Sequence, residues 1–123
     1  MSDRLDLRGR GVSTVPGEVW QARGLRSLAL GRNPLGAIPD AIGALTSLTA
    51  LYLDQTGIEA LPEALGRLQA LRSLDLRETA IAVLPDWLAE LPALQRLDLR
   101  WNGFLGPPPV VRRLRAHGCV VWL

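Results

Sequence analysis

The chain has 123 residues, 48% of them hydrophobic and 21% charged, which is typical of a folded globular domain and excludes a disordered or fibrous protein. Its 14 basic and 12 acidic residues leave a net charge of +2, too small to indicate nucleic acid as the partner. The chain has one cysteine and one histidine, which excludes an intramolecular disulfide and a cysteine-built zinc site. No apolar run approaches the roughly 18 residues of a membrane span, which excludes a helix that crosses a bilayer.

A repeat of 23 residues runs through the chain, and its first unit is incomplete. Five prolines keep this spacing without exception: Pro16, Pro39, Pro62, Pro85 and Pro108. The first unit spans 4–24, and it has Arg10 at the position that Asn33 holds in the next unit. We therefore expect residues 1–24 to form an irregular first coil that caps the N-terminal end of the array.

Residues 25–93 contain three nearly complete units, LRSLALGRNPLGAIPDAIGALTS, LTALYLDQTGIEALPEALGRLQA and LRSLDLRETAIAVLPDWLAELPA, and each opens with the pattern LxxLxL. Because side chains alternate along a strand, both leucines of LxL point toward the core and the residue between them points toward solvent. All units run in the same direction, so neighbouring strands pair in parallel. Six such strands are predicted, centred on Asp6, Ala29, Tyr52, Asp75, Asp98 and Val121.

The second half of each unit predicts a short helix that returns the chain to the start of the next strand. Helix starts are predicted at Pro39-Asp40, Pro62-Glu63 and Pro85-Asp86. Proline suits the first turn of a helix, and an acidic side chain there faces the positive end of the helix dipole. Apolar pairs three residues apart, such as Ile42 and Leu45, face the core. Helices of about two turns depend on stacking for their stability.

Residues 94–123 hold a degenerate last repeat, LQRLDLRWNGFLGPPPVVRRLRA, and a terminal strand. The 23-residue period places Trp122 in the core and Val121 on the open side of that strand. An exposed strand edge is a site of association. Three outcomes fit: the array continues in a longer protein, two copies form a homodimer through this C-terminal edge, or Pro107–Pro109 shield the last coil of a monomer.

The consensus LxxLxLxxNxLxxLPxxLxxLxx resembles the leucine-rich repeat family, in its 23-residue intracellular type seen in Ras-suppressor and Scribble-like proteins, and a small bacterial member fits the chain. The resemblance implies one α/β domain over residues 1–123: a right-handed solenoid with a parallel concave sheet of about six short strands and short convex helices. It also implies that Asn33, Thr56, Thr79 and Asn102 form a hydrogen-bonded ladder, and that a protein partner binds the concave face.

The predicted concave face carries two aromatic residues and a cluster of charges toward its C-terminal half. Tyrosine, tryptophan and arginine are common interface anchors. The residues expected to bind the partner are Tyr52, Asp75, Arg77, Arg96, Asp98, Arg100 and Trp101. The alternative is that Tyr52 and Trp101 only cover neighbouring leucines. Trp20 is expected to cover the first coil, and Trp87 to be half-buried on the convex side.

Candidate catalytic groups are few, and a structural interpretation is favoured for each. Asp75 and Asp98 should be neighbours, as in a retaining glycosidase, but nearby arginines should hold both ionised and an open sheet cannot exclude water. His117 and Cys119 are two residues apart and have no acidic residue beside them to orient the imidazole. We therefore predict no catalytic residue, no cofactor, no metal and no small-molecule substrate.

The sequence as a whole favours a non-catalytic, cytoplasmic module for protein–protein interaction. The alternative is a host-directed bacterial effector, secreted, or the targeting fragment of a larger effector whose catalytic domain lies elsewhere. All 14 basic residues are arginine. The lack of lysine fits either a GC-rich coding bias or selection against ubiquitylation in a host cell.

Overall fold

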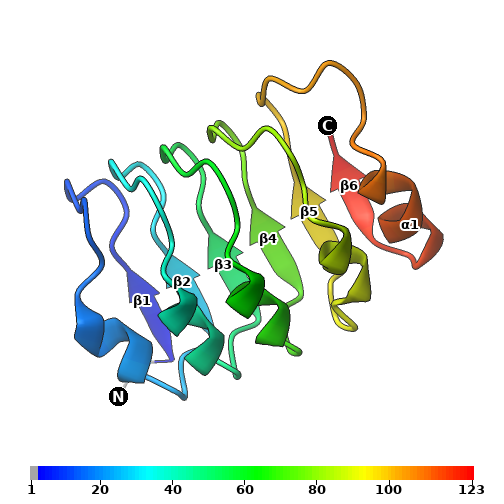
Figure 1. The fold of residues 1–123 in the computed structure, drawn as a ribbon. Helices are drawn as coiled ribbons and strands as arrows, with labels where there is room; N and C mark the ends of the chain where they lie inside the picture. Colours follow the sequence, from blue (N-terminus) through cyan, green and yellow to red (C-terminus); the bar gives the residue numbers. More distant parts are fainter. Residues whose placement is uncertain (1–2) are drawn as a thin grey trace.

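A computed structural model describes residues 3–123, in which six short strands form one parallel sheet (Figure 1). The strands are β1 (Arg4–Asp6), β2 (Ser27–Ala29), β3 (Ala50–Tyr52), β4 (Ser73–Asp75), β5 (Arg96–Asp98) and β6 (Val120–Trp122). Their order in the sheet follows their order in the chain, so β1 and β6 lie at opposite ends of the array. The predicted α/β solenoid is confirmed, although β1 to β5 are centred one residue earlier than expected, on the first leucine of each LxL.

The crossovers lie on one side of the sheet, and four of the five are 3₁₀ helices (Figure 1). These are η1 (Gly17–Gln21), η2 (Asp40–Ala44), η3 (Glu63–Arg67) and η4 (Asp86–Glu90), and the fifth is the α-helix α1 (Val110–Ala116). In η2 the backbone amide of Ile42 donates to the carbonyl of Pro39 at 3.2 Å, and that of Leu45 to Ile42 at 3.0 Å. This i to i+3 bonding places Ile42 and Leu45, both fully buried, on the same side of the turn.

The hydrophobic core fills the space between the sheet and the crossover turns. Leu51, Leu74 and Leu76, from the LxL pairs, are 0%, 1% and 0% exposed. Ile42 and Leu65 meet them from η2 and η3 and are also fully buried. Each coil therefore rests on its neighbours through one continuous apolar layer, as expected for a repeat protein.

The predicted ladder is present at its two asparagines and is interrupted at Thr56, whose hydroxyl donates within its own repeat to the carbonyl of Leu53 at 2.8 Å. Asn33 is 2% exposed; its Oδ1 accepts from the amides of Arg10 and Val12 at 3.0 and 2.9 Å, and its Nδ2 donates to the carbonyls of Leu7 and Leu30 at 2.9 Å each. The first coil, which contains β1 and η1, is thus tied to the second through the backbone at Arg10. Asn102 Oδ1 accepts from both the amide and the hydroxyl of Thr79.

The last strand does not keep the 23-residue period, so the prediction for its side chains is wrong. Leu97 pairs with Val121 and Asp98 with Trp122, a spacing of 24. Val121 is buried at 7% exposure, whereas Trp122 is 40% exposed. The extra residue belongs to the crossover, where α1 replaces a 3₁₀ turn and Gly118 follows at a φ of +89°. A shift of one residue turns every side chain of a strand to the other face.

The remaining tryptophans lie where the sequence places them. Trp20 is buried at 8% exposure within the first coil, and Trp87 is half-buried and packs on the core beside Gly66. Among residues 3–123 no helix has the length and hydropathy needed to cross a membrane.

Candidate functional site

The sheet face, by which we mean the surface of the sheet opposite the crossover turns, gathers all seven residues that the sequence predicts for binding. Tyr52, Asp75 and Asp98 follow the central leucine of β3, β4 and β5, and Arg96 precedes the one in β5. Arg77, Arg100 and Trp101 lie on the segments that leave β4 and β5. Adjacent strands are about 4.8 Å apart, so Tyr52, Asp75 and Asp98, which pair in register, are successive neighbours across the sheet.

Two aspartates on this face are each bound by the arginine two residues later. Arg77 donates to Asp75 from its Nε at 3.0 Å and from its Nη2 at 2.8 Å, and its backbone amide donates at 3.1 Å. Arg100 binds Asp98 in the same way, at 3.0, 2.8 and 3.1 Å. Such forked, charge-assisted pairs fix the position of both side chains.

The two pairs are linked across the sheet by further contacts of Arg77. Its Nε lies 3.6 Å from Asp98 and its Nη2 lies 3.9 Å from Asp54. Burial alone would raise the pKa of Asp98, but the hydrogen bonds from Arg100 and the charges of Arg100 and Arg77 outweigh burial and hold this pKa below its ordinary value. The hydrogen bond to Asp75 raises the pKa of Arg77 in turn. Asp98 is therefore a bound carboxylate.

Arginines also flank both aromatic residues of the sheet face. Arg77 and Arg100 place their guanidinium carbons 5.9 and 5.4 Å from the ring centre of Trp101, and Arg8 lies 5.8 Å from that of Tyr52. Trp101 is nevertheless 64% exposed, so it does not serve as a cover for a leucine. Its ring is oriented by cations that are themselves held by aspartates, which leaves a large apolar surface fixed in place.

The sequence prediction missed Asp54, which is the most deeply buried acid on this face. Asp54 is 5% exposed, and its Oδ1 has no hydrogen-bond partner; Arg8 is 3.5 Å away. The carboxylate lies against Gly31, where a Cβ atom would collide with it. The pattern could have indicated this contact, because Gly31 occupies the place of Arg8 and Arg77 in its own repeat.

The sheet face is hollowed between Tyr52 on β3 and Trp122 on β6. The hollow measures about 190 Å³, and Ser73, Leu74 and Arg96 are among the residues that line it. Trp122 was missed because the 23-residue period turns it inward. Gly118, which favours positive φ, was the available indication that the last crossover differs in length.

Comparison with known proteins agrees with this architecture. A family model described as leucine rich repeat matches residues 59–104. A solved leucine-rich repeat protein of Leptospira interrogans is 28% identical over 89% of this chain, with a TM-score of 0.76. The chain folds as a leucine-rich repeat solenoid. It covers 34% of the Leptospira chain, so it spans about a third of that length. No curated protein matches it.

The leucine-rich repeat fold generally mediates protein–protein interaction. Burial raises the pKa of the Cys119 thiol, which disfavours the reactive thiolate. His117 Nδ1 lies 3.2 Å from the carbonyl of Ala89 on the neighbouring coil. Among residues 3–123 no three histidine, cysteine or acidic side chains are grouped as a metal site would require.

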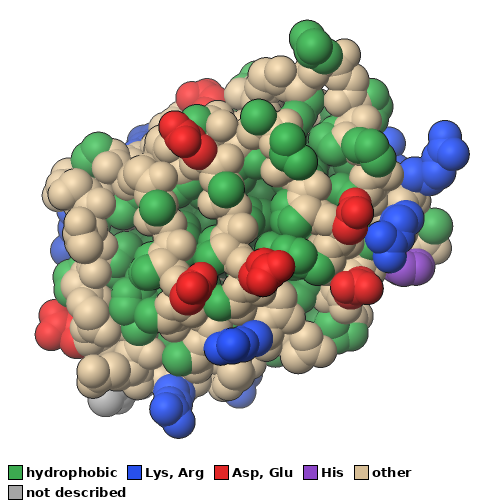
Figure 2. Space-filling view, in the orientation of Figure 1, with side chains coloured by type: hydrophobic (Ala, Val, Ile, Leu, Met, Phe, Trp, Pro, Cys, Tyr) green, Lys and Arg blue, Asp and Glu red, His purple; other side chains and the backbone are tan. Residues whose placement is uncertain are grey.

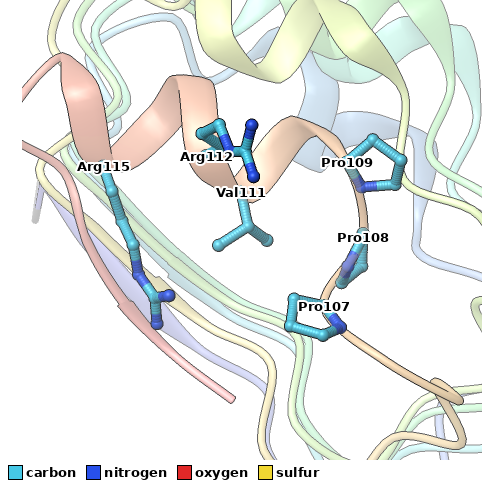
Figure 3. Close-up of a pocket in the computed structure, with 6 residues that line it drawn as sticks. All are labelled: Pro107, Pro108, Pro109, Val111, Arg112 and Arg115. Carbon is cyan, nitrogen blue, oxygen red and sulfur yellow. The ribbon is translucent and has the colours of Figure 1, made fainter.

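A second hollow of this leucine-rich repeat solenoid lies beside α1. It measures about 680 Å³ and is lined by Pro107, Pro108, Pro109, Val111, Arg112 and Arg115 (Figure 3). Val111 lies between the proline segment and Arg115. The Nη2 of Arg115 donates to the carbonyl of Val121 at 3.0 Å, so this arginine ties α1 to β6. Arg112 and Arg113 are exposed on the solvent side of α1.

Proposed function

We propose that this leucine-rich repeat solenoid is a non-catalytic interaction module that binds a protein partner on its sheet face. The residues assigned to the interface are Tyr52, Asp75, Arg77, Arg96, Asp98, Arg100 and Trp101. The observation that carries the proposal is Trp101, which is 64% exposed and has arginines 5.4 and 5.9 Å from its ring centre. Tryptophan and arginine are the residues most enriched among interface anchors.

The order already present in these side chains supports the proposal. Arg77 and Arg100 are each held by two or more hydrogen bonds to an aspartate. Immobilising a long side chain on binding costs about 0.5–1.5 kcal/mol, and side chains that are fixed beforehand avoid much of that cost. By contrast, on most of the face formed by the crossover turns the acidic side chains lie apart from one another among apolar and uncharged ones, and charged side chains of both signs gather beside α1 (Figure 2).

The proposal extends to a bacterial protein that works in the cytoplasm. A second candidate function is the targeting part of a larger host-directed effector. The observation that bears on it is that this chain covers 34% of the Leptospira protein, in which a similar array is therefore part of a longer chain. In that case too, the sheet face is the surface that selects the target.

The test is capture of partners from the lysate of the source organism, with two sheet-face variants and one control variant on the opposite face. Arg100→Ala on the sheet face is compared with Arg67→Ala, an exposed arginine at the end of η3. We expect Arg100→Ala and Trp101→Ala each to weaken binding of the captured partner by at least about 1–2 kcal/mol, and Arg67→Ala to change it by less than about 0.5 kcal/mol. Equal losses from the two faces would refute the assignment of the interface.

A further inference from the structure

The hollow between Tyr52 and Trp122 has the size of a side-chain pocket. Its volume of about 190 Å³ is smaller than the roughly 300–1,000 Å³ of pockets that hold small-molecule ligands. It lies over β4 and β5, with an aromatic ring from β3 on one side and another from β6 on the other. Trp122 is 40% exposed, so the wall that it forms is open to a partner.

The polar groups around this hollow divide into those already bonded and those still free. Asp75 and Asp98 are bonded by Arg77 and Arg100 through both carboxylate oxygens. In the part of the chain that the structure describes, the exposed guanidinium of Arg96 has no hydrogen bond and no ion pair.

The neutral groups of the hollow also offer hydrogens. The hydroxyls of Ser73 and Tyr52 and the indole N–H of Trp122 have no hydrogen-bond partner among residues 3–123. Every free polar group of the hollow can therefore donate a hydrogen bond, and the indole and the guanidinium can do nothing else.

We propose that this hollow receives a carboxylate side chain, aspartate or glutamate, of the protein partner. The inference rests on the proposed function and names the chemistry of one contact within it. Arg96 would bind the carboxylate with two parallel N–H groups, and the indole of Trp122 or the hydroxyl of Ser73 would take a remaining lone pair. The aromatic walls would cover the methylene groups of the incoming side chain.

The balance of charge at the hollow favours an anion over a cation. The lining holds Asp75, Asp98 and Arg96, and the two arginines that bind these aspartates, Arg77 and Arg100, bring the net charge of the five-residue cluster to +1. A lysine or arginine of the partner would have to compete with Arg77 and Arg100 for the two carboxylates and would be repelled by Arg96. The attraction for a carboxylate should weaken as salt is added, because exposed charges are screened over about 10 Å at 0.1 M ionic strength.

The probe is a blocked peptide, acetyl-Gly-Gly-Glu-Gly-Gly-amide, titrated into the full chain and followed by ¹H–¹⁵N NMR at the Trp122 indole and the Arg96 Nε–H. Matched peptides carry glutamine or lysine in place of glutamate. A single ion pair of this kind gives a dissociation constant of the order of 10 mM. We expect saturable shifts with the glutamate peptide that are at least about tenfold weaker in Arg96→Gln and unchanged in Arg67→Gln. Trp122→Phe assigns the indole signal.

Several results would overturn the inference. They are a lysine peptide that shifts Trp122 as strongly as the glutamate peptide, shifts that persist in Arg96→Gln, or no shift with glutamate in that concentration range. Inorganic phosphate that saturates the site below the glutamate peptide would reassign it to phosphate. If the glutamate peptide gave no shift but capture of a partner still depended on Arg100 and Trp101, only the carboxylate pocket would be refuted. The proposed interface would then still hold.

Discussion

Replacing Asn33 tests how much the ladder contributes to the stability of the array. Asn33→Ala removes the acceptor for the amides of Arg10 and Val12, and the donor for the carbonyls of Leu7 and Leu30. A buried donor left without an acceptor costs about 1–3 kcal/mol. Val12 is half-buried and Arg10 is exposed, so water can reach part of the site. Two orphaned amides would cost about 2–6 kcal/mol together. Because water reaches part of the site, we expect the free energy of unfolding to fall by about 3 kcal/mol, near the lower end of this range.

The measurement is equilibrium unfolding in urea, followed by tryptophan fluorescence because Trp20 lies buried in the first coil. Asn33→Thr is the matched control. Thr56 occupies the same position one repeat later and donates a single bond to the carbonyl of Leu53 at 2.8 Å. Threonine at position 33 should therefore recover about 1 kcal/mol of the loss. A loss below about 1 kcal/mol for Asn33→Ala would show that the first coil is held by packing alone.

The other predictions address the core, one glycine, the last strand and acid stability. Leu74→Ala should lower the free energy of unfolding in urea by about 2–5 kcal/mol because Leu74 is 1% exposed, whereas Leu105 is fully exposed and Leu105→Ala should have no measurable effect. An unchanged urea midpoint for Leu74→Ala would contradict the assigned core. Gly31→Ala should cost about 1–3 kcal/mol through collision with Asp54, and Gly36→Ala, with open space around it, should not; equal effects would exclude the collision. Val121→Lys should unfold the last coil at a lower temperature in a thermal scan, because Val121 is 7% exposed, whereas Val120→Lys, at a site 51% exposed, should leave the coil folded. Val120→Lys should also abolish any homodimer formed through β6, as measured by light scattering. If Val120→Lys proved the less stable variant, the 23-residue register would be the correct one. The pKa of Asp98 is lower in the folded protein than the value of about 3.9 in the unfolded chain, so its contribution to stability is complete above pH 3.9 and is lost as pH falls through the folded pKa. In Asp98→Asn the free energy of unfolding should therefore fall less steeply with pH in this acidic range.

The sequence determined the sheet, the core and the rows of the sheet face. The alternation within LxL decides which side chains are buried, and Leu51, Leu74 and Leu76 are buried as it requires. A constant period then places equivalent residues of successive repeats side by side, and Tyr52 pairs with Asp75 and Asp75 with Asp98 in the sheet. These features depend only on local periodicity and on contacts between adjacent coils, both of which can be read directly from a repeat.

Tertiary structure decided the features in which one repeat differs from the next. The register of β6 depended on the length of the last crossover, and α1 with Gly118 made Val121 the buried residue and Trp122 the exposed one. The partner of each arginine depended on distances across several strands, so the burial of Asp54 beside Gly31 and the free guanidinium of Arg96 could not be read from the order of charges. Periodicity fixes which row a side chain belongs to, whereas its partners are fixed by packing among rows, and that packing exists only in the folded array.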